Sequence, residues 1–258
     1  MQEARLEAQR RIPSGIWACR PCAVNLPAFS VAGLAPYTLP YGDPVPRIDD
    51  YKQALKLASE QLTDKDPELL ASLSGAVTGR DKEGRRTLTL NALNQRVRIT
   101  WPEVTFASEK PEQEIPIQQQ ILYLHYLCGA WSSKGVRATG EWISFQEIPD
   151  GRFYMDAFQR RAKNPMVMTF GEEPDLLLKV ATELYGAVPF NQGDVSVVVR
   201  ALPLVPIALI LWKGDEEFPP EGNVLFDRSI IEIFSAEDIA WLSGMVVYPM
   251  IGRAKAKT

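Results

Sequence analysis

The chain has 258 residues, a net charge of −4 and 46% hydrophobic residues, which is the composition of an ordinary globular protein. The length allows one large domain or two small ones. Because Lys and Arg are not in excess, we expect no nucleic-acid partner. The longest apolar run, residues 201–212, is shorter than a bilayer span and contains two prolines, so we expect no membrane-spanning helix.

The N-terminus and the cysteines bear on the cellular compartment. The first residues carry charges of both signs and lead into no uninterrupted apolar segment, unlike a secretory signal. The cysteines, Cys19, Cys22 and Cys128, are few and odd in number, which fits a reducing compartment. We therefore expect a cytoplasmic protein. Together with His125 the three thiols would supply the four ligands of a zinc site, but ordinary thiols are the simpler interpretation.

Three segments are expected along the chain. Residues 1–47 contain seven of the 20 prolines and are interpreted as a proline-rich N-terminal extension. The compact domain is expected over residues 48–247. Residues 248–258 would form a basic tail.

The domain is predicted to open with two short helices, over residues 49–62 and 66–75. Aspartates supply the N-terminal caps, and Gly75 ends the second helix. Residues 87–90 and 97–100 then alternate between apolar and polar side chains with a period of two. This pattern predicts a small antiparallel meander.

The middle of the chain is predicted to be mostly helical. Pro116 begins a helix that should end at Gly129. A strand over residues 142–145 and a helix over residues 153–163, closing before the next proline, follow. Another helix is predicted over residues 174–186, with a glycine as its stop.

The last third of the chain is rich in strand-forming residues. Residues 195–200 and 204–212 are predicted strands, and Ser235 with Asp238 forms a capping box for a last helix. Strands and helices come in clusters instead of alternating strictly. This arrangement favours a single α+β domain, with a mixed or mostly antiparallel sheet and several packed helices.

Four short stretches resemble a known family. They are GEWISF at 140–145, AFQRR at 157–161, WKGDEEFPP at 212–220 and LFD at 225–227. On these residues the chain resembles the DUF3786 family of uncharacterised prokaryotic proteins, over about residues 48–247. The resemblance implies a single domain but no settled activity. Similar proteins are typical of anaerobes, and some are fused to iron–sulfur modules; the single CxxC of this chain cannot supply the four thiolates of a cluster.

His125 is the only histidine of the chain. Neighbouring aromatic residues, Tyr123, Tyr126 and Trp131, surround it on an apolar predicted helix. Such an imidazole would suit an axial ligand of a haem or a corrinoid. The alternative is a core histidine whose nitrogens are satisfied by the backbone or by a carboxylate.

Asp215, Glu216 and Glu217 place three carboxylates directly after an apolar strand. Crowding of carboxylates raises the pKa of at least one of them or attracts a hard cation. One hypothesis is therefore an acid/base or magnesium-binding role for this cluster. The spacing matches no EF-hand loop. A solvated turn is the alternative interpretation.

Arg160 and Arg161 follow an aromatic helical segment and would suit an anion-binding cleft. They would equally suit the C-terminal carbonyl groups of a helix. No glycine-rich phosphate loop and no GxSxG or HExxH signature is present in the sequence.

These features lead to one main hypothesis and two rivals. The main hypothesis is a non-enzymatic ligand-binding or accessory protein with an aromatic-lined cleft and a polar rim formed by the two arginines and the acidic cluster. The expected cleft residues are Trp142, Phe145, Phe153, Tyr154 and Trp212. In its sharper form, guided by the resemblance, the ligand is a metal tetrapyrrole, a corrinoid before haem, with His125 below the metal. The rivals are a small-substrate enzyme that uses the acidic cluster with Mg²⁺, and a protein–protein adaptor that uses residues 1–47.

Overall fold

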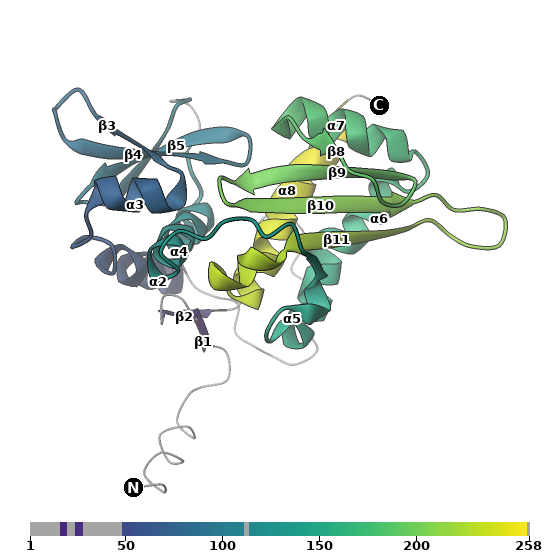
Figure 1. Ribbon diagram of the computed structural model, residues 1–258, viewed down its shortest axis with the longest axis horizontal. Helices are drawn as coiled ribbons and strands as arrows, with labels where there is room; N and C mark the ends of the chain where they lie inside the picture. Colours follow the sequence, from purple (N-terminus) through teal and green to yellow (C-terminus); the bar gives the residue numbers. More distant parts are fainter. Residues whose placement is uncertain (1–15, 20–23, 28–47, 111–113, 257–258) are drawn as a thin grey trace, which may run out of the picture.

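The computed structural model describes residues 16–19, 24–27, 48–110 and 114–256. It shows an α+β body with a four-stranded and a five-stranded sheet, both antiparallel, and helices packed against them (Figure 1). The predicted fold class is therefore confirmed.

The body begins with helices α2 (Ile48–Glu60) and α3 (Pro67–Ser74). The Asp66 carboxylate caps α3 by accepting hydrogen bonds from the N–H groups of Glu68 and Leu69, at 2.8 and 2.9 Å. Gly75 ends the helix with a φ of 71°, a conformation that glycine adopts without strain. Both predicted helices are present.

The predicted meander is a four-stranded sheet in the order β3-β4-β5-β6. Its strands are β3 (Val77–Arg80), β4 (Arg86–Ala92), β5 (Gln95–Trp101) and β6 (Thr105–Ser108). Side chains alternate across its faces as expected for strands, with Leu88, Leu90, Val97 and Ile99 fully buried.

Helix α4 (Ile117–Ser132) runs through the core and packs against α2 and α3. The prediction that it ends at Gly129 was wrong, because the helix continues for three more residues. Gly129 does not end the helix; its missing side chain allows α4 to lie close to the backbone of Ile233. A Cβ atom at this position would lie 2.2 Å from the carbonyl oxygen of Ile233.

The five-stranded sheet has the order β7-β11-β10-β9-β8, with every neighbouring pair antiparallel. Its strands are β7 (Trp142–Ser144), β8 (Val188–Pro189), β9 (Val195–Leu202), β10 (Val205–Trp212) and β11 (Glu221–Asp227). Strand β11, which the sequence did not predict, joins β7 to the rest of the sheet.

One nearly continuous helical segment follows β7. It contains the 3-10 turn η2 (Phe145–Glu147), α5 (Gly151–Phe158), the π-helical turn η3 (Gln159–Lys163) and α6 (Asn164–Phe170). The predicted helix end before Pro165 was wrong. Pro165 lies in the first turn of α6, where its missing N–H costs little. The preceding π turn has a different backbone hydrogen-bonding pattern from an α-helix, and the helical segment continues through it. Helix α7 (Pro174–Tyr185) then ends at Gly186, as predicted.

Helix α8 (Ala236–Lys255) follows the 3-10 turn η4 (Arg228–Glu232) and lies behind the five-stranded sheet (Figure 1). The predicted capping box of Ser235 and Asp238 is present. The expected boundary at residue 247 falls inside this helix. Because Met250 and Ala254 are buried, residues 248–255 pack with the body instead of forming a separate tail.

Tyr126 and Leu93 connect the two sheets. The Tyr126 hydroxyl donates to the carbonyl of Ser74 and accepts from the N–H of Leu204, so α4 is bonded both to α3 and to the β9–β10 turn. The N–H of Leu93 donates to the carbonyl of Ala201 at 2.7 Å. These bonds hold both sheets in one body.

Part of the predicted N-terminal extension is described only as backbone. Strands β1 (Ile16–Cys19) and β2 (Val24–Pro27) pair antiparallel. Cys22 and the side chain of Cys19 lie outside the described residues, and Cys128 is a buried free thiol. Among the described residues, no helix has the length and apolar character needed to cross a bilayer.

Candidate functional site

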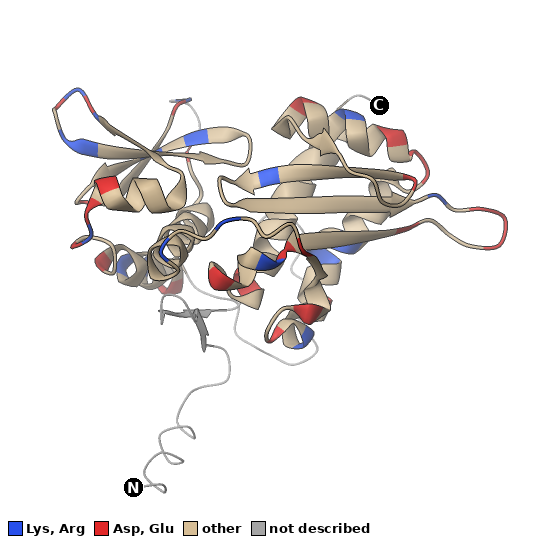
Figure 2. Ribbon diagram, in the orientation of Figure 1, with Lys and Arg blue, Asp and Glu red and all other residues tan. Residues whose placement is uncertain are grey.

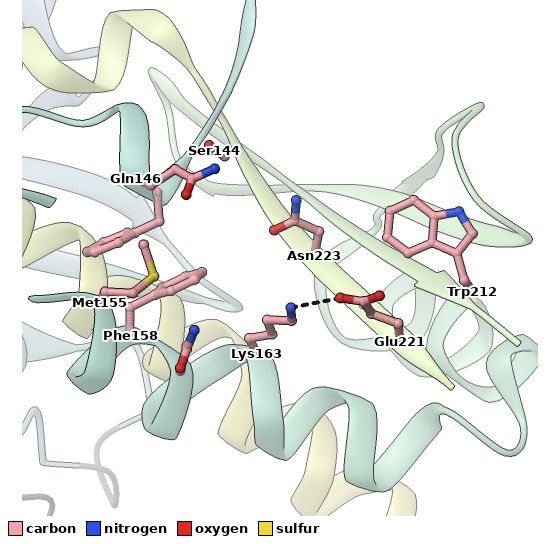
Figure 3. Close-up of a pocket in the computed structure, with 11 residues that line it drawn as sticks. Ser144, Gln146, Met155, Phe158, Lys163, Trp212, Glu221 and Asn223 are labelled. Atoms are coloured by element: carbon pink, nitrogen blue, oxygen red, sulfur yellow. Dashed lines mark hydrogen bonds and ion pairs between the residues drawn. The ribbon is translucent and has the colours of Figure 1, made fainter. Parts of the chain in front are cut away.

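A cleft of about 480 Å³ lies between the α5–η3 segment and the edge of the sheet formed by β7, β11 and β10 (Figure 3). Two of the predicted aromatic residues, Phe145 and Trp212, line it. The cleft forms because β7 pairs with β11, with Ser144 opposite Leu225. This pairing places the helical segment that follows β7 over the sheet edge.

The closed end of the cleft is aromatic. Phe145 and Phe158 stack face to face, with ring centroids 4.2 Å apart and an interplanar angle of 1°. Phe226 of β11 meets both rings edge-on, at 6.2 and 6.1 Å. All three side chains are buried, so this end of the cleft has a fixed shape.

The π-helical turn supplies polar side chains from the helical side. Gln159 and Lys163, its first and last residues, both line the cleft. A π turn is wider than an α-helical turn, and such turns are common at functional sites. The same turn joins α5 to α6, and both η3 and α6 contact β11.

The remaining polar groups come from β7, from η2 and, on the opposite wall, from β11. Figure 3 shows the amide of Gln146 directed toward Asn223, while the Lys163 amino group reaches Glu221 across the cleft. The Lys163 Nζ to Glu221 Oε1 distance is 3.1 Å. Because this pair cancels its own charge, the lining carries no net charge.

Trp212 lies at the open end of the cleft (Figure 3). It is the last residue of β10, and its side chain is 40% exposed, more than is usual for so large an apolar group. An indole face at the mouth of a polar cleft offers a flat apolar surface to a ligand.

The comparisons with known proteins give a family and no activity. The family model described as "Domain of unknown function (DUF3786)" matches residues 66–248. The chain belongs to the DUF3786 family. No curated protein and no solved structure matches it.

His125 lines none of the cavities described for this DUF3786 domain. Its side chain is fully buried, and its Nδ1 atom lies 2.9 Å from Asp238 Oδ1. The Asp238 carboxylate also accepts from the hydroxyl of Ser235 at 2.7 Å. Burial opposes the charge of Asp238, but His125 and the hydrogen bonds of Ser235 outweigh it and lower the pKa of this carboxyl group.

These residues do not fit a tetrapyrrole held through His125. An axial ligand must present a ring nitrogen to the metal at the wall of a pocket. Here the imidazole lies inside the packing of α4 and α8, away from the cleft that contains Phe145 and Trp212.

The other predicted aromatic residues of the DUF3786 domain lie elsewhere. Phe153 and Tyr154 line a second cavity at the start of α8. Trp142 packs against Phe190, with ring centroids 5.1 Å apart. The five predicted aromatic residues are thus divided among three places.

The twin arginines do not form the rim of the cleft. Arg160 is paired with Asp156 at 2.7 Å on the surface of α5. Arg161 is largely buried toward α8, where desolvation lowers its pKa despite the favourable charge of Glu237. Neither side chain lines the cleft.

The acidic cluster lies at the tip of the β10–β11 hairpin (Figure 2). The Asp215 carboxylate accepts hydrogen bonds from the N–H groups of Glu217 and Phe218, both at 2.8 Å, and these bonds lower its pKa. Such bonds stabilise a tight turn. Within the described part of the chain, no group of three or more His, Cys, Asp or Glu side chains is placed to hold a metal ion.

Asp227, from the LFD stretch of the family resemblance, organises the loop before β7. Its carboxylate accepts from the N–H groups of Thr139, Gly140 and Ser229, at 2.7 to 3.0 Å, and from the Thr139 hydroxyl. Burial works against ionisation, but the hydrogen bonds prevail and lower the pKa of Asp227. We interpret this residue as structural.

Sequence reasoning missed most polar residues of the cleft. They are Gln146, Gln159, Lys163 and Asn223. Amides scattered over two distant segments carry no motif. The available signal was the alternation of Gly222, Val224 and Phe226, which marks β11 and would have placed its neighbours at the sheet edge.

Proposed function

We propose that this protein binds a small uncharged molecule in the cleft between η3 and the β7–β11–β10 edge. The ligand would carry several hydroxyl or amide groups and one flat apolar face, the chemistry shared by sugars and nucleosides. This proposal retains the aromatic-lined cleft expected from the sequence and replaces the tetrapyrrole as its ligand.

The observation that carries the proposal is the neutral polar lining beside the Trp212 indole. Gln146, Gln159 and Asn223 each offer a donor and an acceptor, which suits a ligand with mixed hydrogen-bonding groups. The Lys163–Glu221 pair adds charge-assisted contacts without favouring an anion or a cation. A ring lying on Trp212 would bury apolar surface on one side.

Binding is favoured over catalysis by the state of the lining residues. The Ser144 hydroxyl donates to Glu147 Oε2 at 2.7 Å, and the hydrogen bonds from Ser144 lower the pKa of this carboxyl group, so Glu147 is a weaker base than usual for activating a nucleophile. The enzyme hypothesis based on Asp215, Glu216 and Glu217 and the adaptor hypothesis based on residues 1–47 stay predictions, with no observation of the described residues in their favour.

Isothermal titration of the full chain with glucose, uridine and adenosine tests the proposal. We expect one class of probe to bind, and Trp212→Ala and Gln146→Ala each to weaken binding about tenfold, because a good stacking or hydrogen-bonding contact is worth about 1.4 kcal/mol. Phe218→Ala is the matched control, since Phe218 is an exposed aromatic residue that does not line the cleft. Absence of binding by all three probes, or equal affinity in the Trp212 variant, would contradict the proposal.

A further inference from the structure

A second cavity, of about 370 Å³, lies between the start of α5 and the start of α8. Its walls are mainly apolar and include Ile148, Ile231 and Phe234. Phe153 and Tyr154 of α5 add two aromatic rings. Phe153 is 80% exposed, although burial of its ring would be favourable. The cavity therefore offers aromatic and apolar surface to a small ligand.

The charged groups of this cavity are all acidic. Asp150 and Glu232 are exposed, whereas Glu237 is only 4% exposed. Among the described residues that line the cavity there is no Lys, Arg or His. The cavity therefore combines an apolar interior with an electrostatic preference for a positive charge.

Glu237 lies where charged groups from several elements converge. The Tyr154 hydroxyl of α5 is 3.5 Å from its Oε2 atom, and Asp238, paired with His125 of α4, is the next residue. Burial raises the pKa of Glu237 to about 8, the charge of Asp238 adds to the rise, and Arg161 of η3 and Tyr154 oppose it. Glu237 lines the cavity, whereas Arg161 does not.

We propose that this cavity binds a small organic cation, an ammonium group on an apolar or aromatic body, with Glu237 as its counter-ion. Aromatic faces attract such cations through their quadrupoles, most strongly when the site is desolvated. A bare metal ion fits less well, because no set of metal-binding side chains is present in the described residues. The site is separate from the cleft of the proposed function, and its test is independent of it.

The buried carboxyl group couples ligand binding to a proton. At neutral pH the side chain of Glu237 is mostly protonated, and an ammonium ligand would stabilise the carboxylate form. The proton of the carboxyl group then passes to the solvent. Affinity should fall about tenfold for each pH unit below the pKa of Glu237 and level off above it.

Benzyltrimethylammonium is a suitable probe, because its charge does not change with pH, and benzyl alcohol is the uncharged control. Titration calorimetry of the full chain near pH 7, in two buffers of different ionisation enthalpy, should report release of roughly one proton per bound cation. Glu237→Gln should weaken binding by about tenfold or more and abolish the proton release. The Glu216→Gln variant, which alters an exposed carboxyl group at the distant hairpin tip, should bind the cation with the same affinity as the natural chain.

Three results would overturn the proposal. They are failure of the cation to bind at millimolar concentration, equal affinity for benzyl alcohol and the cation, and unchanged affinity in Glu237→Gln. If that variant does not fold, the natural chain still decides the question: affinity that does not change between about pH 6 and pH 9 contradicts the role of Glu237.

Discussion

The Nδ1 atom of His125 lies 2.9 Å from Oδ1 of Asp238, and both side chains are buried where α4 meets α8. Ser235 completes this arrangement by donating its hydroxyl to the other oxygen of Asp238. The only imidazole of the chain thus joins the middle of one helix to the first turn of another. Its role is structural, and it connects the two halves of the core.

Replacing Asp238 by alanine should destabilise the fold by about 3 to 5 kcal/mol, because it removes one partner of a buried pair together with the N3 carboxylate of the α8 capping box. Urea unfolding followed by circular dichroism measures this change. Glu216→Ala, at an exposed position, should change the unfolding free energy by about 0.5 kcal/mol or less. Equal stability of the two variants would contradict the structural role of the pair.

Acid should weaken the fold through Asp227. The pKa of Asp227 is lower in the folded state than in the unfolded chain. Ionised Asp227 therefore stabilises the fold at pH values above its unfolded-state pKa, about 4, and this stabilisation is lost as the pH falls through its folded-state pKa. Asp227→Asn, which keeps the shape but cannot ionise, should flatten this part of the stability curve. Unfolding free energies measured between about pH 2 and pH 6 test the prediction. A curve of the same slope in the variant would refute it.

Ionisation of Glu237 should destabilise the fold as the pH rises, the opposite of the effect of Asp227. Its folded pKa is raised to about 8 from an ordinary value of 4.5, so the folded state binds the proton more tightly than the unfolded chain. Stability should therefore fall as the pH rises from 4.5 to about 8, by at most about 1.4 kcal/mol per pH unit. Glu237→Gln should remove this slope and be more stable than the natural chain at about pH 8. Parallel stability curves would show that Glu237 does not titrate in this range.

Gly129 and Gly252 make a matched pair of helical glycines. Gly129→Ala should destabilise the protein by about 1 to 3 kcal/mol or more, since its Cβ would meet the Ile233 carbonyl oxygen at 2.2 Å. Gly252→Ala in α8 meets nothing within 4 Å and should stabilise the helix by up to about 1 kcal/mol. Thermal unfolding of both variants tests this contrast. Similar melting temperatures would contradict it.

Local signals explain what the sequence predicted well. Asp66 before a proline and Gly75 bound α3 as expected, and Ser235 with Asp238 starts α8, because each signal acts through neighbouring backbone groups. The glycine signal failed at Gly129, where the missing side chain serves a contact with a residue about a hundred positions later. A sequence pattern cannot distinguish these two uses of glycine.

The cleft was only partly predictable, because it is formed by long-range pairing. Phe145 and Trp212 were expected on aromatic content alone, whereas Asn223 depends on β11 pairing with β7. The π turn that supplies Gln159 and Lys163 has almost the same local pattern as an α-helix. Polar residues that come together only in the folded protein have no characteristic spacing in the sequence by which they could be recognised.

The most direct test of the proposed function is the indole N–H signal of Trp212 in a spectrum of the chain labelled with ¹⁵N-tryptophan. The sequence has six tryptophans, and Trp212→Phe would assign the relevant signal. On titration with the glucose, uridine and adenosine panel, we expect this signal to shift while those of the buried Trp101 and Trp241 stay in place. A Trp212 signal that does not move with any member of the panel would contradict the proposed binding cleft.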